Sequence, residues 1–141
     1  KVLALAEEII RRFAVKAPGA GAPARSLSGG NLQKFILGRE ILQAPSLLVA
    51  AHPTWGVDVG AAALIHRALI ALRDAGTAIL VVSEDLDELF LLSDRIAALC
   101  SGRLCPAVAT ASASPQQVGG WMAGQFEAPA AVAGAVAQGS L

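Results

Sequence analysis

The sequence predicts an α/β fold in which a mainly parallel sheet is flanked by helices. Short apolar runs alternate with segments of helical period, which is the order of strands and crossover helices. Apolar residues make up 55% of the 141 positions and charged residues 16%, so the chain has enough apolar surface to build a core. The eleven basic and eleven acidic residues balance, which argues against a protein that binds nucleic acid through phosphate contacts.

The chain divides into three predicted parts. Residues 1–110 carry the α/β pattern, residues 111–127 form a short docking segment, and residues 128–141 form an Ala/Gly-rich tail that we expect to be mobile. No apolar run approaches the ~18 residues that a membrane span needs. The two cysteines are too few for a disulfide scaffold and fit a reducing compartment.

The first elements are helices. Apolar residues at helical spacing predict a helix over Lys1–Phe13, and the Pro/Gly-rich stretch Ala17–Pro23 predicts a loop. A second helix is expected from Ser28, as its N-cap, to about Gln43, because Pro45 ends it.

Two strands and their connecting helix follow. The unbroken apolar runs Leu47–Ala51 and Thr77–Val82 predict strands that are buried on both faces and pair in parallel. Between them we expect a turn at Pro53–Gly56 and a helix over Val59–Asp74, with Gly76 as its stop.

The last elements are shorter. Ser83-Glu84-Asp85 opens a predicted helix, and Ile96–Cys100 and Arg103–Val108 predict an antiparallel hairpin that turns at Ser101-Gly102. Cys100 and Cys105 flank the turn of this hairpin, which allows them to face each other across it, and they are expected to be small packing residues. A short helix is predicted around Val118, Trp121 and Met122, and His66 is expected on the solvated face of its helix.

The segment Leu27-Ser28-Gly29-Gly30-Asn31 carries the clearest chemistry. Two glycines after a hydroxyl residue at a helix start allow a close approach and direct backbone N–H groups at an anion. The segment therefore favours a phosphate-binding site, in which the Ser28 hydroxyl is a further donor. By itself the triplet favours an ordinary serine N-cap before a glycine-rich helix entry, and it is the surrounding segments that change this interpretation.

Four segments in order resemble the second half of an ATP-binding-cassette (ABC) ATPase domain. Leu27–Asn31 resembles the signature motif, Leu47–Thr54 the Walker B strand, Gly56–Asp58 the D-loop and Ser83-Glu84 the switch region. The stretches Asn31–Lys34, Ala51–Gly60 and Ser83–Leu89 are similar to the second cassette of tandem importers for nucleosides and simple sugars. The resemblance implies the C-terminal part of a P-loop NTPase domain without its Walker A strand.

The sequence departs from this family at three positions. The family's Walker B strand ends in Asp-Glu, where the Asp supports Mg²⁺ and the Glu polarises water, but here these positions are Ala51 and His52. Glu84 replaces the switch histidine, and its charge would repel a γ-phosphate. His52 and Glu84 are therefore degenerate at catalytic positions, and the resemblance implies no catalytic pair and no metal site of this chain's own.

No G-x-x-x-x-G-K-[ST] phosphate loop occurs in the 141 residues. We therefore expect the chain to be the C-terminal part of a longer polypeptide or a truncated product, and to bind neither ATP nor Mg²⁺ in isolation. The isolated chain is expected to be inactive.

The family's head-to-tail pairing of cassettes implies a role for the intact motif. Ser28, Gly29, Gly30 and Asn31 would contact the γ-phosphate of ATP held with Mg²⁺ by the opposite cassette, and Asp58 and Trp55 would lie at the seam. Asp58 also fits a plain helix N-cap. The implied partners are the opposite cassette, transmembrane permease subunits and, indirectly, a substrate-binding protein, at the cytoplasmic face of the cell membrane.

Two other functions remain open at this point. One is a non-catalytic structural or regulatory cassette half that only supports dimerisation, which the missing Asp-Glu pair favours. The other is the head domain of a chromosome-maintenance or DNA-repair ATPase, which also uses a Ser-Gly-Gly signature. Such heads keep an acidic Walker B strand and join long heptad coiled coils, and this sequence has neither.

Overall fold

A computed structural model describes residues 1–126, which form two compact units, Lys1–Ser93 and a second one that begins at Asp94. The predicted mobile tail at 128–141 lies outside the described residues, and the predicted division at residue 110 stays a prediction. The elements of the first unit are α1 (Val2–Arg12), η1 (Ala24–Ser26), α2 (Gly29–Leu42), β1 (Leu47–Ala51), α3 (Val59–Asp74), β2 (Ala78–Val82) and α4 (Leu86–Leu92). Each predicted helix and strand of this unit is confirmed, within one to three residues at most ends.

The sheet of the first unit consists of β1 and β2 in parallel, as predicted. Leu47 pairs with Ala78, and the register continues to Ala51 opposite Val82. Helix α3 connects the two strands and ends at Asp74, with Ala75 as its C-cap. Gly76 then takes a positive φ of 99° that a glycine adopts without steric cost. The carboxyl ends of both strands therefore lie side by side at one end of the sheet. The turn after β1 and the segment before α4 begin there.

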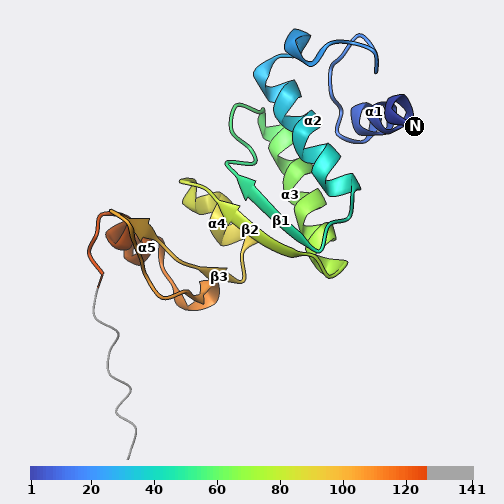
Figure 1. Cartoon of the computed structure of the whole chain (residues 1–141). Helices are drawn as coiled ribbons and strands as arrows, with labels where there is room; N and C mark the ends of the chain where they lie inside the picture. The colour runs from blue at the N-terminus through green and yellow to red at the C-terminus, as the bar shows by residue number, and fades with distance from the viewer. Residues whose placement is uncertain (127–141) are drawn as a thin grey trace, which may run out of the picture. The chain divides into compact units, whose positions relative to one another are not determined.

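Helices α2 and α3 pack against one face of this sheet (Figure 1), where α2 contacts β1 and α3 contacts β2. The opposite face is apolar and exposed, with Val49 and Leu80, a pair in register, 60% and 54% exposed. The prediction that both strands are buried on both faces is therefore wrong for the described residues. A run without polar residues indicates that both faces are apolar, but it does not indicate that both are covered.

The core of the first unit lies between the helices and the sheet. Its largest fully buried side chains include Phe13, Ile9 and Ile65. Phe13, at the end of α1, packs over Gly38 of α2, where an added Cβ would lie 2.6 Å from the phenyl ring. The glycine thus allows α1 and α2 to approach closely, and any larger residue there would displace the ring.

The second unit contains short antiparallel pairs. Strand β3 (Arg95–Ile96) pairs with β6 (Val108–Ala109), and β4 (Leu99–Cys100) pairs with β5 (Arg103–Leu104). The predicted hairpin is confirmed, and its turn has positive φ at Ser101 (49°) and Gly102 (75°), as a tight hairpin turn requires. The predicted single strand Ile96–Cys100 is interrupted, since residues 97 and 98 belong to no strand.

The cysteines do not face each other. Cys100 lies opposite Arg103, whereas the buried Cys105 accepts a hydrogen bond at Sγ from the backbone N–H of Ala98. Both thiols are free. They do not meet because the two-residue turn pairs Cys100 with Arg103, two positions before Cys105.

A short helix, α5 (Pro115–Met122), follows η2 (Thr110–Ser112), as predicted around Val118 and Trp121. Ser114 caps it by accepting a hydrogen bond from the backbone N–H of Gln117, and α5 packs against β4. Val118 and Trp121 are buried, while Met122 is 39% exposed. Across residues 1–126, none of the helices has the length and apolar character to cross a membrane.

Candidate functional site

The motif Leu27–Asn31 lies at the start of α2. Ser28 has extended backbone angles, and the first intrahelical hydrogen bond runs from the N–H of Leu32 to the carbonyl of Ser28 at 2.8 Å. The amides of Gly29, Gly30 and Asn31 precede this bond, so the helix itself provides no acceptor for them. Gly29 is exposed, and an added Cβ there would meet no atom within 4 Å. The helix start therefore presents several donors at the positive end of a helix dipole, which suits an anion.

Ser28 is the N-cap residue of α2, as predicted, but its side chain makes no capping hydrogen bond to the helix. Its Oγ accepts a hydrogen bond from Nδ2 of Asn31 at 2.8 Å, and Oδ1 of Asn31 accepts one from the backbone N–H of Lys16 at 2.9 Å. Asn31 thus holds Ser28 against the loop that follows α1. In this arrangement the Ser28 hydroxyl proton is still available to donate to a ligand.

The turn after β1 begins at His52. The N–H of His52 donates to the carbonyl of Val82 at 2.7 Å, so the parallel pairing extends one residue beyond β1. His52 then adopts a left-handed φ of 48°, which is uncommon for a residue other than glycine and directs the chain sharply out of the sheet. Its ring lies edge-on to Trp55, with 6.0 Å between centroids. Trp55 is 81% exposed and therefore not part of the core.

The residues at this strand end do not fit a Mg²⁺ site. Ala51 has no side-chain ligand atom, and His52 offers nitrogen where Mg²⁺ prefers oxygen. Within residues 1–126, no three His, Cys, Asp or Glu side chains are gathered so that they could hold a metal ion. We therefore assign no catalytic step of this chain to a bound metal.

Asp58 is the N-cap of α3. Its Oδ1 accepts a hydrogen bond from the N–H of Ala61 at 2.9 Å, and this bond holds the pKa of Asp58 below its ordinary value. The N-cap interpretation is thus confirmed. Because the side chain is also exposed, Asp58 remains accessible to another molecule.

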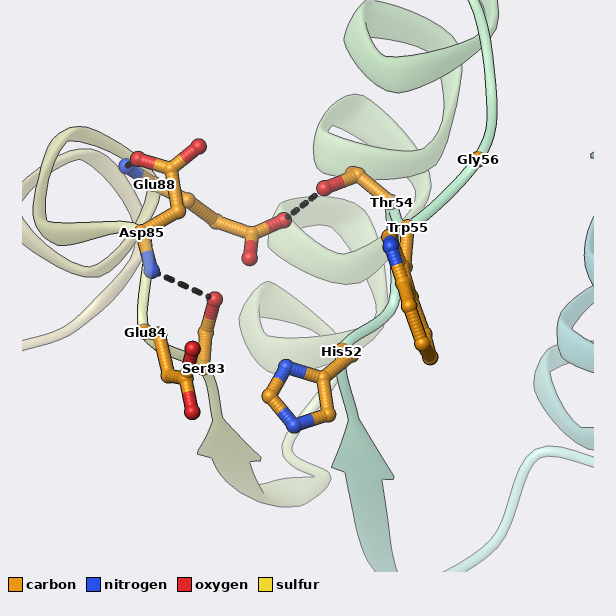
Figure 2. Close-up of a pocket in the computed structure, with 8 residues that line it drawn as sticks. All are labelled: His52, Thr54, Trp55, Gly56, Ser83, Glu84, Asp85 and Glu88. Carbon is orange, nitrogen blue, oxygen red and sulfur yellow. Dashed lines mark hydrogen bonds between the residues drawn. The ribbon is translucent and has the colours of Figure 1, made fainter.

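A hollow of about 440 Å³ lies at the carboxyl ends of β1 and β2 (Figure 2). The turn after β1 and the segment leading into α4 line it; its residues are His52, Thr54, Trp55, Gly56, Ser83, Glu84, Asp85 and Glu88. The structure thus brings His52 and Glu84 to one hollow, whose lining contains three carboxylates, Glu84 itself included, and neither lysine nor arginine. The negative charges of these carboxylates would repel a phosphate, so the residues of the hollow alone do not suit phosphate binding.

Glu88 connects the two walls of the hollow. Its side chain is 2% exposed, and its Oε1 accepts hydrogen bonds from Oγ1 of Thr54 at 2.7 Å and from Nε2 of His66 at 3.0 Å. Figure 2 shows the carboxylate reaching from the start of α4 to Thr54. The other oxygen, Oε2, is buried and has no hydrogen-bond partner among the described residues.

The prediction that His66 lies on a solvated helix face is therefore wrong. Its side chain is only 17% exposed, because α4 packs against α3 and places Glu88 over the ring. Glu88 itself was missed by the sequence analysis. The signal available in the sequence was its spacing of four from Leu92, which puts a carboxylate on the buried stripe of α4.

Gln33 and Gly30 join α2 to the same turn. Nε2 of Gln33 donates to the carbonyls of His52 at 3.1 Å and Pro53 at 3.3 Å. At Gly30 an added Cβ would lie only 2.7 Å from the carbonyl oxygen of Gly56, so only glycine allows this approach. The structure therefore places the motif at 27–31 next to the turn, although Ser28 does not line the hollow.

Lys34, also in α2, is a buried residue whose role was not predicted from the sequence. It is 7% exposed, and its Nζ donates to the carbonyl of Ala14 at 2.7 Å, which fixes the end of α1 to α2. A buried ammonium group needs such a partner, so this contact belongs to the scaffold that carries the motif.

The chain is similar to import ATP-binding proteins. It is 46% identical over 122 residues to a guanosine import ATP-binding protein, NupO, of Bacillus subtilis, and 44% identical over 124 residues to a nucleoside import ATP-binding protein, NupA, of Lactococcus lactis. These matches cover 86% and 88% of this chain but 24% of each relative. The chain thus spans about a quarter of the length of these relatives. No protein-family profile matches it.

Solved structures show the same fold. An ATP-binding subunit of an ABC transporter matches 85% of this chain and 55% of its own, with a TM-score of 0.72 at 19% identity. A dimeric cassette, MJ0796, bound to ADP and phosphate matches 76% of this chain and 46% of its own, with a TM-score of 0.66 at 22% identity.

Proposed function

Because the chain belongs to the ATP-binding-cassette family, we propose that it forms part of the ATP-hydrolysing subunit of an importer. In this proposal the start of α2 completes the ATP site of an opposite cassette. The names of the relatives, which include guanosine, nucleoside, ribose and glucose import proteins, support a nucleoside or simple sugar as the cargo.

The observation that carries this proposal is the geometry of Ser28–Asn31. The hydrogen-bond donors are the backbone amides of the first turn of α2, including that of the exposed Gly29, and the Ser28 hydroxyl, which Asn31 holds in place. The helix itself provides no acceptor for these amides. The γ-phosphate of ATP, held with Mg²⁺ by the opposite cassette, is the anion that this set suits. The exposed Asp58 would lie at the seam between the cassettes.

The partners follow from this role. The chain would pair with the opposite cassette, in tandem or as a dimer, and with transmembrane permease subunits, at the cytoplasmic face of the cell membrane. The dimeric cassette among the structural relatives supports the first of these pairings. Through the permease, a substrate-binding protein would be an indirect partner.

The isolated chain should neither hydrolyse ATP nor bind Mg·ATP more tightly than about millimolar affinity. Its 141 residues contain no phosphate loop. Ala51 and His52 stand where the acidic pair would be, and they cannot hold Mg²⁺ and activate water as that pair would. Isothermal titration calorimetry with ATP, with and without Mg²⁺, checks this. Micromolar binding that depends on Mg²⁺ would contradict it.

A second candidate function is a structural cassette half that supports dimerisation without taking part in hydrolysis. The degenerate end of β1, with Ala51 and His52, favours this alternative for the chain's own site. It predicts that the motif at the start of α2 can be altered without loss of ATP turnover.

Vanadate trapping tests the proposed role in the assembled transporter. Vanadate replaces the γ-phosphate after hydrolysis, and ultraviolet light then cleaves backbone that contacts it. We expect cleavage of this chain within Ser28–Asn31, located by mass spectrometry, since these residues would surround the trapped group. If the opposite cassette is trapped and cleaved at its own phosphate loop while this chain remains intact, the proposal is wrong.

A further inference from the structure

The carboxylate of Glu88 fixes the turn that follows β1. Oε1 accepts one hydrogen bond from Thr54, which lies 34 residues earlier in the turn, and one from His66 of α3. The backbone N–H of Glu88 donates to Oδ1 of Asp85, the N-cap of α4. One buried side chain therefore ties the first turn of α4 to the turn 52–56 and to α3.

The turn 52–56 is held on its other side by α2. Gln33 donates to the carbonyls of His52 and Pro53, and the backbone of Gly30 approaches Gly56 as closely as a glycine allows. Gly30 is itself part of the Ser28–Asn31 motif. Glu88, Thr54, the turn and the start of α2 thus form a continuous series of contacts.

We propose that Glu88 is a positioning residue for the Ser28–Asn31 motif, and that it acts through Thr54 and the turn 52–56. This inference rests on the proposed function, because it concerns how the phosphate-binding end of α2 is oriented. Glu88 touches no nucleotide in this role. It fixes the turn that Gln33 and Gly30, at the start of α2, contact directly.

The hydrogen bond from Thr54 is the vulnerable step in this series. Oε2 of Glu88 already has no partner among the described residues, so Oε1 carries all the side-chain hydrogen bonds of a buried carboxylate. Removal of the Thr54 hydroxyl leaves the carboxylate with His66 alone and removes the side-chain bond between Glu88 and the turn. The turn is then free to shift, and Gln33 and Gly30 shift with it.

Thr54→Val in the assembled transporter tests this inference, because valine keeps the shape of threonine and removes the donor. We expect the ATP turnover number to fall by about 10- to 100-fold, the scale of a small misplacement of a catalytic element. Amide exchange of peptides spanning residues 27–36 should become faster, by about ten-fold or more at the Leu32 amide that begins α2. Thr54→Ser, which restores the hydroxyl, should recover both quantities.

The matched control is Thr77→Val. Thr77 also donates a buried hydroxyl hydrogen bond, to the carbonyl of Pro45 at 2.8 Å, but it lies at the opposite end of the sheet. This variant should leave turnover and the exchange of residues 27–36 close to those of the unmodified protein. An equal effect of Thr77→Val, or an unchanged exchange rate in Thr54→Val, would show that Glu88 does not position the motif.

The result also separates this inference from the proposed function. If Ser28→Arg abolishes turnover while Thr54→Val changes neither turnover nor exchange, the positioning role is wrong and the proposed function stands. If Ser28→Arg has no effect on turnover but Thr54→Val accelerates exchange at residues 27–36, the contacts position the motif and the proposed function is wrong. Faster exchange with unchanged turnover, in a transporter that Ser28→Arg inactivates, also overturns the positioning role.

Discussion

Ser28→Arg should lower the ATP turnover of the assembled transporter by about 100-fold or more, the scale seen when one preorganised anion-binding donor is lost. The variant removes the hydroxyl donor and places a long side chain where the first-turn amides of α2 would meet a phosphate. It also deprives Nδ2 of Asn31 of its acceptor. The measurement is steady-state ATP hydrolysis at saturating ATP, with the binding of nucleotide measured separately.

Two variants are the controls for this result. Ser26→Arg makes the same change in η1, two residues before Ser28, where the exposed hydroxyl donates only to the carbonyl of Pro23. His52→Ala removes the ring at the degenerate strand end, where Ala51 has already lost the ligand atom. Both should change turnover by less than about three-fold, within the range of substitutions away from a functional contact.

Two outcomes would decide against the proposed role. Unchanged turnover in Ser28→Arg would favour the structural cassette half, whose motif only supports dimerisation. A loss in His52→Ala as large as that in Ser28→Arg would show that the chain's own site is catalytic in spite of its altered residues.

The isolated chain should self-associate through the exposed face of the β1–β2 sheet. Val49 and Leu80 are adjacent in register and more than half exposed, and Leu47 and Val82 extend the same apolar face. The two-stranded sheet of the first unit also leaves one edge of each strand without a strand partner among residues 1–126. Exposed apolar strands with free edges pair readily with other strands, so we expect dimers or larger species at micromolar concentration.

Val49→Lys should shift the isolated chain toward monomer, measured by sedimentation velocity over a range of concentrations. The matched control is Val59→Lys, which makes the same change at the start of α3, where the valine is 88% exposed and away from the sheet. A monomeric unmodified chain that unfolds cooperatively at about 45–65 °C would contradict the expectation. Equal effects of both lysine variants would mean that charge alone, and not the sheet face, controls association.

Much of the candidate site was predictable from the sequence because its parts are local. Ser28, Gly29, Gly30 and Asn31 are consecutive at a helix start, and Asp58 caps the helix that it precedes. Helical periodicity and apolar runs likewise predicted the helices and strands themselves, since these patterns depend on residues close to each other in the sequence. The helix between the two strands then predicted their parallel pairing. The similarity to import ATP-binding proteins then confirmed the family that the four motifs indicated.

The parts that the sequence did not predict depend on contacts between distant segments. Glu88 meets Thr54 across 34 residues and His66 across 22, and Gln33 meets His52 across 19. Apart from the spacing of Glu88 from Leu92, nothing in the local pattern distinguishes these polar side chains from solvated ones, because burial and hydrogen bonding are determined only when helices and sheet pack together.

The sequence by itself determined the order and type of the elements, the glycine-rich start of α2 and the absence of an acidic pair at Ala51 and His52. Only the tertiary structure decided which sheet face is covered, that Asn31 rather than a backbone amide engages Ser28, and that Glu88 is buried. The physical reason is the range of the forces involved. Backbone geometry and helix capping act within a few residues, whereas a buried carboxylate is stabilised only by donors that folding brings to it from elsewhere in the chain.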